Sequence, residues 1–466
     1  AGRLTPRHED WTAAVRAGLS ARLEANVDHP IALALSGGGD SMALLQVATD
    51  WARENGRRLL ALTVDHGLNP ESAGWTAFAE QAARAAGADW RGLIWQEAKP
   101  ATGLPAAARR ARHTLIAEAA RAAGARVVLF AHTKDDIAEG ELMRAEGSTL
   151  GRLRDWAPSP VWPEGRGLML LRPMLGAGRA ELRDWMTARG LNWIDDPANE
   201  DPKYARSRAR ASLLPMGGGA RAPDEGQLVE AATPPPDSRP SPFRATDRSA
   251  PGRSSPLPTG EGSFQIDRTI EAFTLAAVLV CAGGGERTPR GERLAGLMAR
   301  LGAGENFTAT LCGARIEAEG ERVLATRESG EFLRRPPPPL PLSPGVAAVW
   351  DGRWFIETGQ PGWSVVPAAG RLTALSDADR AALKSLPPAV RGGLPVLIRH
   401  EGGAPVLAVK AAKAGSLVEQ RLALALDRMT HERDLGPGIH GAAPPDRLFS
   451  TGQQWRSVGA PGNETE

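Results

Sequence analysis

Six small and polar residues form the segment best suited to phosphate chemistry. They are Ser36, Gly37, Gly38, Gly39, Asp40 and Ser41. The segment follows an apolar stretch typical of a buried strand and precedes a helical pattern, and α/β folds bind ligands at such junctions. The N–H groups and dipole of a helix N-terminus favour phosphate, and glycines let the backbone approach it closely. The segment therefore predicts a nucleotide-phosphate site, with serine hydroxyls as donors and Asp40 holding Mg²⁺ or orienting the loop.

The spacing of the glycines separates this loop from two common nucleotide-binding motifs. No lysine follows the glycines, so the G-x-x-x-x-G-K-[ST] loop is excluded. The third glycine of G-x-G-x-x-G is also missing, because Asp40 stands in the first helical turn. A glycine-rich turn that binds no ligand is the alternative.

Two polar residues follow the next apolar stretch, residues 59–64. Asp65 could accept hydrogen bonds from a ribose or an adenine amino group, and His66 comes directly after it. An isolated histidine is more often a packing or capping residue than a catalytic one, so only Asp65 is assigned to the nucleotide site.

Acidic residues gather after a third apolar stretch, residues 126–131. His132 opens this segment and is assigned to the nucleotide site. Asp136 and Glu139 are three residues apart and Asp135 and Glu139 four apart, which places the acids on one helical face. They could bind Mg²⁺ or a substrate amine. The alternative is that acids are favoured there by the helix dipole alone.

Basic residues occur in two places that could meet phosphate or RNA. Arg109 and Arg112 share one helical face and could bind phosphates of ATP or RNA, although a solvated basic helix is the alternative. Arg206 and Arg208 belong to a basic cluster, with Lys203 and Arg210, beside Tyr204, the only tyrosine. Cations beside a ring suit loop or single-stranded RNA, but a simple run of charge is equally consistent.

The segments that must position these residues alternate between strand and helix. Apolar stretches at 31–35, 59–64 and 126–131 lack polar alternation, as expected of parallel strands buried on both faces. Helical patterns separate them, including 73–86 and 105–123. This order predicts an α/β fold with a doubly wound, mostly parallel sheet, whose strand ends bring the polar residues to one rim.

The length of 466 residues implies two or three domains. Residues 1–215 are predicted to form the catalytic domain, and the proline-rich segment 216–262 a disordered linker. Residues 263–335 read as a helical and hairpin domain. Residues 346–466 read as a second, α+β part, for which the family resemblance described below implies RNA binding.

The overall composition excludes few partners. The 56 basic and 54 acidic residues give a net charge of +2, so charge neither requires nor excludes a nucleic acid. Two distant cysteines argue against a disulfide framework or a structural zinc site. Without a long apolar run or a signal-peptide pattern, we expect a cytoplasmic protein with no membrane partner.

Several motifs, taken together, resemble one enzyme family. The pattern S-G-G-x-D-S resembles the PP-loop of ATP pyrophosphatases, which cleave ATP between the α- and β-phosphates and belong to the HUP-like α/β folds. Further motifs resemble the tRNA(Ile)-lysidine synthetase family over roughly residues 30–215. These motifs are LSGGGDS, VDHGLNPESA, AAARRARH, AHTKDDIAEGELMR, LLRPMLGAGRAELRDWMTARGLNWIDDPANED and YARSRAR.

The resemblance implies a ligase that forms a carbon–nitrogen bond. The C2 oxygen of the first anticodon cytidine in a CAU-anticodon tRNA(Ile) attacks the α-phosphate of ATP, and the ε-amine of free L-lysine then displaces AMP. It implies that the glycine loop holds ATP and Mg²⁺, and that Asp136 and Glu139 receive the lysine amine. It also implies that Arg109 or Arg112 stabilises phosphoryl charge, that Asp135 lies with the substrate, and that Arg206 and Arg208 face the RNA. A homodimer is one assembly left open.

The sequence departs from the family pattern at a few positions and leaves two other functions open. Gly39 stands where valine is usual, Ile137 where glutamine is common, Gly140 where threonine is common and Ser207 where asparagine is usual. A tRNA thiolase is one alternative, although its chemistry generally needs cysteines near the site. A nucleotide- or RNA-binding paralogue without catalysis is the other.

Overall fold

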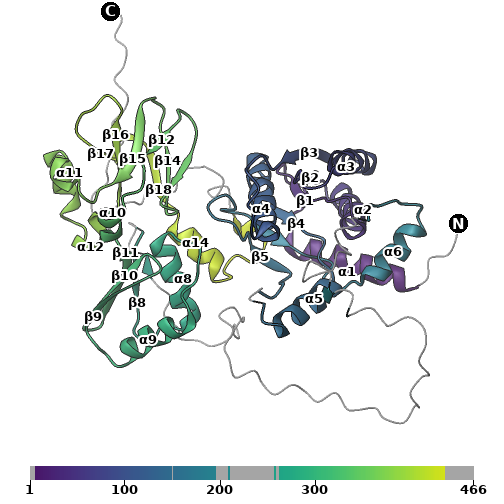
Figure 1. Cartoon of the computed structure of the whole chain (residues 1–466), viewed down its shortest axis with the longest axis horizontal. Coiled ribbons are helices and arrows are strands. Elements are labelled where there is room, and N and C mark those ends of the chain that lie inside the picture. Colours follow the sequence, from purple (N-terminus) through teal and green to yellow (C-terminus); the bar gives the residue numbers. More distant parts are fainter. Residues whose placement is uncertain are drawn as a thin grey trace, which may run out of the picture. The chain divides into compact units, whose positions relative to one another are not determined.

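The computed structural model describes residues 6–148, 151–195, 208–209, 212, 257–258 and 262–435. These residues form two compact units. The first contains the described residues before Ser241 together with those from Asp427 onward, and the second contains those between Pro242 and Leu426 (Figure 1). Tyr204 and Arg206 lie outside the described residues, and Arg208 is exposed.

A six-stranded sheet with the order β3-β2-β1-β4-β6-β5 forms the centre of the first unit. All neighbouring strands are parallel except β5 and β6, which are antiparallel. The predicted α/β fold with a mostly parallel sheet is therefore confirmed. The strands are β1 (Ile31–Ala34), β2 (Leu59–Asp65), β3 (Asp89–Ile94), β4 (Val127–Leu129), β5 (Trp156–Pro158) and β6 (Met169–Leu171).

The strand order reverses between β1 and β4. From β1 the chain proceeds to β2 and β3 on one side, and β4 and β6 lie on the other side. Register pairs Ala32 with Val128 across β1 and β4, and Leu33 with Ala61 across β1 and β2. Ligands of open α/β sheets bind at this kind of reversal, at the carboxyl ends of the strands. The glycine loop follows β1 and the acidic segment follows β4, so both leave the sheet there.

Several helices of the first unit bury apolar residues. The helices are α1 (Pro6–Arg22), α2 (Gly39–Glu54), α3 (Ser72–Ala86), α4 (Leu104–Ala122), α5 (Lys134–Ala145) and α6 (Arg179–Thr187). The buried residues of α5 are instead the acids Asp136 and Glu139. Ile116 and Ala120 of α4 are buried in one cluster with Leu62 of β2 and Val128 of β4. Trp11 of α1 meets Trp185 of α6 edge to face, with 5.3 Å between the ring centroids.

The second unit contains three smaller sheets with the orders β7-β8-β11-β10-β9, β12-β15-β16-β17 and β13-β14-β18. Its first sheet packs with α8 (Ala272–Gly283) and α9 (Gly291–Gly302) in one apolar core. The strands of this sheet are β7 (Leu257–Pro258), β8 (Phe264–Ile266), β9 (Phe307–Leu311), β10 (Ala314–Glu319) and β11 (Arg322–Arg327). These elements lie between Leu257 and Arg327.

The other two sheets share a second apolar core. Their strands are β12 (Leu340–Leu342), β13 (Ala348–Trp350), β14 (Trp354–Glu357), β15 (Trp363–Pro367), β16 (Pro395–Arg399), β17 (Val406–Leu407) and β18 (Lys413–Ser416). The accompanying helices are α10 (Gly330–Arg334), η2 (Leu372–Ala374), α11 (Asp377–Leu383), α12 (Pro388–Arg391) and α13 (Ala408–Ala411). Helix α14 (Val418–Ala425) instead packs with α8 in the core of the first sheet. In the described part of the chain, every helix is too short or too polar to cross a bilayer.

Two findings differ from the predicted domain limits. Most of the predicted linker 216–262 lies outside the described residues, but Leu257 and Pro258 within it form β7 and pair with β8 at the edge of a sheet. An edge strand tolerates proline because one side of it has no partner strand. The segment Asp427–Leu435, which ends in η3 (Glu432–Leu435), belongs to the first unit rather than to the second.

Side-chain contacts show how the segment Asp427–Leu435 packs on the first unit. Asp427 pairs with Arg154 at 2.6 Å, and the indole N–H of Trp156 donates to the Met429 carbonyl at 2.8 Å. Glu432 and Arg57 form a pair at 2.8 Å with both side chains completely buried. This segment is therefore an integral part of the unit that carries the glycine loop.

Candidate active site

The glycine loop between β1 and α2 is closed by its own serines. The hydroxyls of Ser36 and Ser41 lie 3.1 Å apart, and the Ser41 hydroxyl donates to the Gly38 carbonyl at 2.9 Å. The backbone N–H of Ser36 donates to the Ser41 hydroxyl at 3.3 Å. The two predicted phosphate donors thus hold each other and the loop backbone in place.

A segment after α6 lies along this loop and explains one of its glycines. Ile194 donates its N–H to the Gly37 carbonyl at 2.9 Å, and Gly38 and Ile194 form a parallel bridge. Gly37 has a φ of +81°, and a Cβ there would lie 2.7 Å from Cδ1 of Ile194. Both facts require glycine at position 37. At Gly39 a Cβ would only touch the Trp193 ring at 3.6 Å, so the fold itself does not require glycine there.

Four of the five predicted acids of the site converge on a single residue, Arg179. Its guanidinium pairs with Asp40 at 3.2 Å, Glu139 at 3.1 Å and Asp136 at 3.4 Å. Its backbone N–H also donates to the Asp135 carboxylate at 2.8 Å. The structure therefore joins the acid of the glycine loop to the acids of α5, which are far apart in sequence.

The acids of α5 combine a capping role with this pairing. Thr133 is the N-cap of α5, and Asp136 accepts the Thr133 N–H at 2.8 Å in a capping box. The other oxygen of Asp136 faces Arg179. Glu139, which is 1% exposed, contacts the same guanidinium. Capping of the helix N-terminus therefore accounts for one oxygen of Asp136 but not for Glu139.

Sequence reasoning missed Arg179 because nothing local distinguishes it from the other arginines. It is the first residue of α6, after N-cap Gly178, whose N–H donates to Glu181 at 2.8 Å. Burial alone would lower the pKa of Arg179, but the charges of Asp40, Asp136 and Glu139 raise it above its usual value. Arg179 is therefore a permanent cation in the site. The only sequence signal was its place in the R-P-M-L-G-A-G-R segment.

Asp65 and His66 lie at the end of β2, the strand beside β1. The Asp65 carboxylate accepts the Gly67 N–H at 2.7 Å, which fixes the turn after the strand. The His66 ring meets Trp95 edge to face at 6.0 Å. Burial, followed by the charge of Arg112, lowers the pKa of His66. His66 thus packs as a neutral ring against Trp95, as the packing interpretation describes. In Asp65, only Oδ1 accepts the Gly67 N–H, and Oδ2 takes no part in this turn.

A second group of site residues consists of arginines and histidines from α4, from the end of β4 and from the end of β6. Arg109 and Arg112 lie on α4 beside His113, which is buried. Burial and the nearby charges of Arg112, Arg109 and Arg172 lower the pKa of His113 to about 3. Arg172 donates to the ring of His132 at 3.1 Å. The predicted arginines thus lie in a cationic cluster that could face phosphate.

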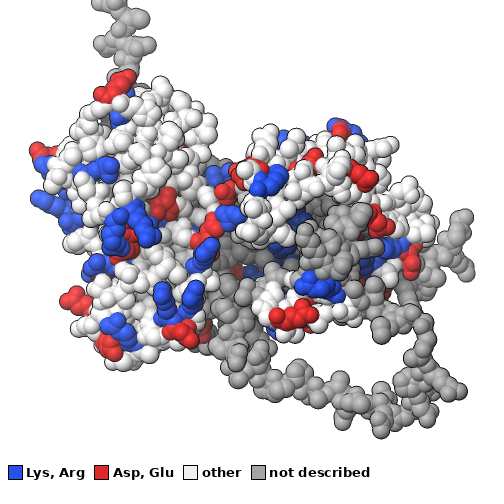
Figure 2. Space-filling view, in the orientation of Figure 1, with Lys and Arg blue, Asp and Glu red and all other residues white. Residues whose placement is uncertain are grey.

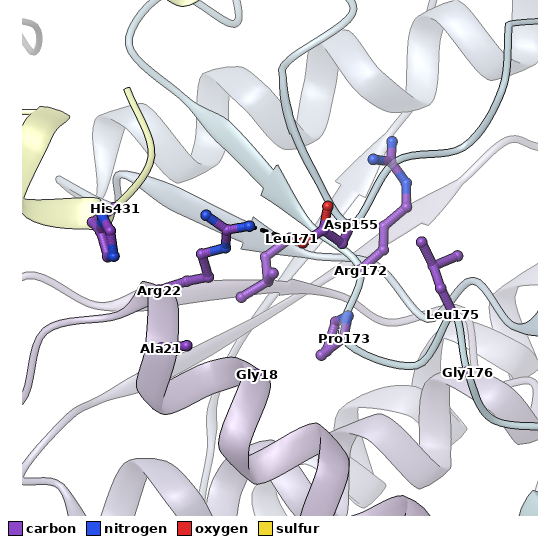
Figure 3. A pocket seen from close by; sticks show the side chains of 10 residues that line it. All are labelled: Gly18, Ala21, Arg22, Asp155, Leu171, Arg172, Pro173, Leu175, Gly176 and His431. Atoms are coloured by element: carbon purple, nitrogen blue, oxygen red, sulfur yellow. Dashed lines mark hydrogen bonds and ion pairs between the residues drawn. The ribbon is translucent and has the colours of Figure 1, made fainter. Parts of the chain in front are cut away.

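A cavity of about 470 Å³, lined in part by Arg172, lies between α1, the segment after β6 and His431 (Figure 3). Arg22 pairs there with Asp155 at 3.0 Å and donates to the Thr430 carbonyl at 2.9 Å. Figure 3 shows the side chain of Arg172 extending away from Arg22. Because Arg22 and Asp155 neutralise each other, and Arg172 and His431 have partners outside the cavity, we assign no ligand to it.

A cluster of Glu24, His29 and Glu432 has the composition of a metal site. However, Arg57 donates to both carboxylate oxygens of Glu432, at 2.8 and 2.9 Å. The guanidinium already supplies the positive charge that a metal ion would bring. We therefore interpret this cluster as a buried ion pair that fastens the segment Asp427–Leu435.

Comparison with known proteins decides the family. A family profile described as a PP-loop domain matches residues 12–216. A tRNA(Ile)-lysidine synthase from Caulobacter vibrioides is 48% identical over 92% of this chain and 96% of that protein. The chain belongs to the tRNA(Ile)-lysidine synthase family. Family members from Hyphomonas neptunium and Mesorhizobium japonicum are each 34% identical, over 78% and 85% of this chain and 96% and 89% of those proteins.

Proposed function

We propose that this chain ligates free L-lysine to C2 of the first anticodon cytidine of CAU-anticodon tRNA(Ile), using ATP. The cytidine C2 oxygen attacks the α-phosphorus of ATP and pyrophosphate leaves. The lysine ε-nitrogen then forms a bond to C2, the C2–oxygen bond breaks, and AMP and a proton are released. The observation that carries this proposal is the convergence of four acids beside a serine–glycine loop in a chain 48% identical to a lysidine synthase.

The glycine loop would bind the phosphates of ATP. It leaves β1 at the reversal of strand order and opens α2, where N–H groups and the helix dipole favour anions. Arg109 and Arg112 would add positive charge near the transferring phosphoryl group. Asp65 and His132, at neighbouring strand ends, would lie with the adenosine and phosphates.

The acid cluster would select cations. Three carboxylates already reach one guanidinium, so this set of oxygens fits a positive group. Mg²⁺, when bound, would be held by Asp40 and would neutralise charge on the phosphates. Asp136 and Glu139 would receive the lysine ammonium. Glu139 is almost completely buried, and a buried carboxylate is suited to take the proton that the amine must lose before it can attack.

The RNA-facing residues rest on sequence alone. Arg206 and Tyr204 lie outside the described residues, and Arg208 is exposed. Among the described residues visible in Figure 2, basic and acidic side chains are interspersed over both units, and they form no single-signed surface on this face that would mark a tRNA path. The assignment of 346–466 to RNA binding and the homodimer both stay predictions, which footprinting on tRNA and a mass measurement in solution would test.

Pyrophosphate release is the direct test of the proposed reaction. We expect release from ATP only with tRNA(Ile) present, and lysidine in the tRNA only when lysine is added. Asp40→Ala should abolish release, whereas Asp50→Ala, an exposed acid on the same helix, should retain it. Turnover by Asp40→Ala at the normal rate would remove the glycine loop from the mechanism.

The lysine assignment needs a separate variant. Glu139→Ala should raise the lysine concentration needed for half-maximal ligation or stop the transfer, because the buried carboxylate is lost. Glu141→Ala, an exposed acid on the same helix, is the matched control. An unchanged lysine dependence in Glu139→Ala would show that the amine binds elsewhere.

The thiolase alternative has little support in this chain. Its two cysteines lie in the second unit, and burial raises the pKa of the Cys281 thiol to about 12. A thiol of such high pKa is a poor source of the thiolate that sulfur transfer requires.

A further inference from the structure

His132 is held in a column of stacked rings at the end of β4. Its ring stacks on Phe130 with 5.9 Å between centroids, and Phe130 stacks on His113 at 5.1 Å. The next residue, Thr133, caps α5. The stacking and the cap fix the position of the imidazole, so the remaining variable is which ring nitrogen carries the proton.

Arg172 determines that proton position. The Nε–H of Arg172 donates to Nδ1 of His132 at 3.1 Å. An arginine side chain can donate hydrogen bonds but cannot accept them. Nδ1 of His132 must therefore be the acceptor, which leaves the ring proton on Nε2. The contact excludes both the doubly protonated ring and the Nδ1–H tautomer.

Arg172 is itself anchored, so this contact is not a chance encounter of surface groups. Its side chain is buried, and its guanidinium donates to the Arg154 carbonyl at 2.8 Å. Its backbone N–H donates to the Asp155 carbonyl at 2.7 Å. Burial and the charges of Arg109 and Arg154 lower the pKa of Arg172 to about 10, which still leaves it a cation at neutral pH.

We propose that Arg172 is a positioning residue that keeps His132 neutral with its proton on Nε2, so that the ring offers an N–H donor to a nucleotide phosphate oxygen. This inference rests on the proposed function, because it assigns the acceptor to ATP or the adenylated intermediate. Arg172 itself need not touch the nucleotide. Its charge and its hydrogen bond act through the imidazole.

Nuclear magnetic resonance of the full chain with ¹⁵N-labelled histidine tests the tautomer without any assay of activity. The signal of His132 is identified by its absence in His132→Gln. We expect the protonated nitrogen to be Nε2 in the unaltered protein, and Arg172→Met to populate the Nδ1–H or doubly protonated ring. Arg166→Met is the matched control. Burial also lowers the pKa of Arg166 to about 10, but its guanidinium donates to the Pro163 carbonyl and not to a histidine.

A double-variant cycle tests whether Arg172 acts through His132. Glutamine offers an amide N–H near the position of Nε2 and has no tautomers. Arg172→Met should lower kcat for pyrophosphate release roughly tenfold to hundredfold, with KM for tRNA unchanged. In the His132→Gln background the same change should have no further effect. An Nδ1–H ring in the unaltered protein, or additive losses in the double variant, would overturn the inference. Absence of pyrophosphate release from the unaltered protein would instead refute the proposed function and leave the tautomer result standing.

Discussion

Arg179 gives the acid cluster an internal counter-ion. One guanidinium contacts carboxylates from α2 and α5, and the backbone of the same residue holds a fourth acid. Like charges brought this close destabilise one another unless a cation lies between them. Any Mg²⁺ or amine that binds these acids must therefore share them with Arg179 or displace it.

Arg179→Ala should change catalysis and lysine binding in opposite directions. We expect kcat for lysidine formation to fall at least tenfold, because the acids lose the group that orients them. KM for lysine should fall, since an internal competitor for the carboxylates has been removed. Initial rates over a range of lysine concentrations measure both. Arg183→Ala, an exposed arginine on the same helix, is the control, and an unchanged KM would contradict the competition.

Gly37 and Gly39 should respond differently to the same substitution. Gly37→Ala places a Cβ 2.7 Å from Ile194 in a residue with positive φ, so we expect a loss of about 1–2 kcal/mol of stability and at least tenfold slower pyrophosphate release. Gly39→Ala adds only an ordinary contact with Trp193 and should lose less. Chemical denaturation measures the stability of both variants, and a pyrophosphate assay measures their activity. Equal losses of stability and activity in the two variants would contradict the loop geometry described above.

The segment Asp427–Leu435 stabilises the unit on which it packs. Its ion pair between Glu432 and Arg57 is completely buried, and the backbone N–H of Glu24 donates to the same carboxylate at 2.9 Å. Removing one member of a buried pair leaves the other charge uncompensated. This arrangement predicts that the N-terminal unit depends on residues close to the other end of the sequence.

Glu432→Gln should lower the free energy of unfolding of the first unit by about 3–5 kcal/mol. Urea denaturation followed through the tryptophan fluorescence of the full chain measures this change. Asp434→Asn, a partly exposed acid in the same turn, should have a much smaller effect. Similar losses of unfolding free energy in both variants would show that the buried ion pair stabilises the unit no more than the exposed acid does.

Element prediction succeeded where the apolar pattern was strong and failed where it was weak. The stretches 31–35 and 59–64 are buried on both faces and correspond to β1 and β2. The edge strand β3 was missed, because its sequence DWRGLI mixes charged and apolar residues and much of it is exposed. An edge strand gains its structure from pairing with β2, which local sequence does not reveal.

Contacts between distant parts of the sequence set the limit of prediction for the site. The acids could be found because each follows a strand, and strand ends of a parallel sheet meet at one rim. Arg179 could not be identified from the sequence, because its acidic partners lie 40 to 139 positions away. Its local sequence does not distinguish it from the other arginines of the chain. The packing of Asp427–Leu435 on the first unit was hidden for the same reason.

The stability of the folded chain should fall in acid because of Glu432. Burial alone would raise the pKa of Glu432, but the hydrogen bonds and charge of Arg57 lower it below 4.5. A carboxyl with a lowered pKa in the folded state stabilises the fold above its unfolded pKa, and this contribution is lost as pH falls through the folded value. Unfolding free energies between pH 7 and pH 3 should therefore drop less steeply in Glu432→Gln than in the unaltered protein. Parallel curves would contradict this assignment.

The return of Asp427–Leu435 to the first unit also bears on synthesis. Arg57 is synthesised early, but its carboxylate partner Glu432 is synthesised only after residues 242–426 of the second unit. In a chain that stops before Glu432, the unit with the glycine loop and the acid cluster would bury Arg57 without its counter-charge. We therefore expect the first unit to reach its full stability only after Glu432 has been synthesised.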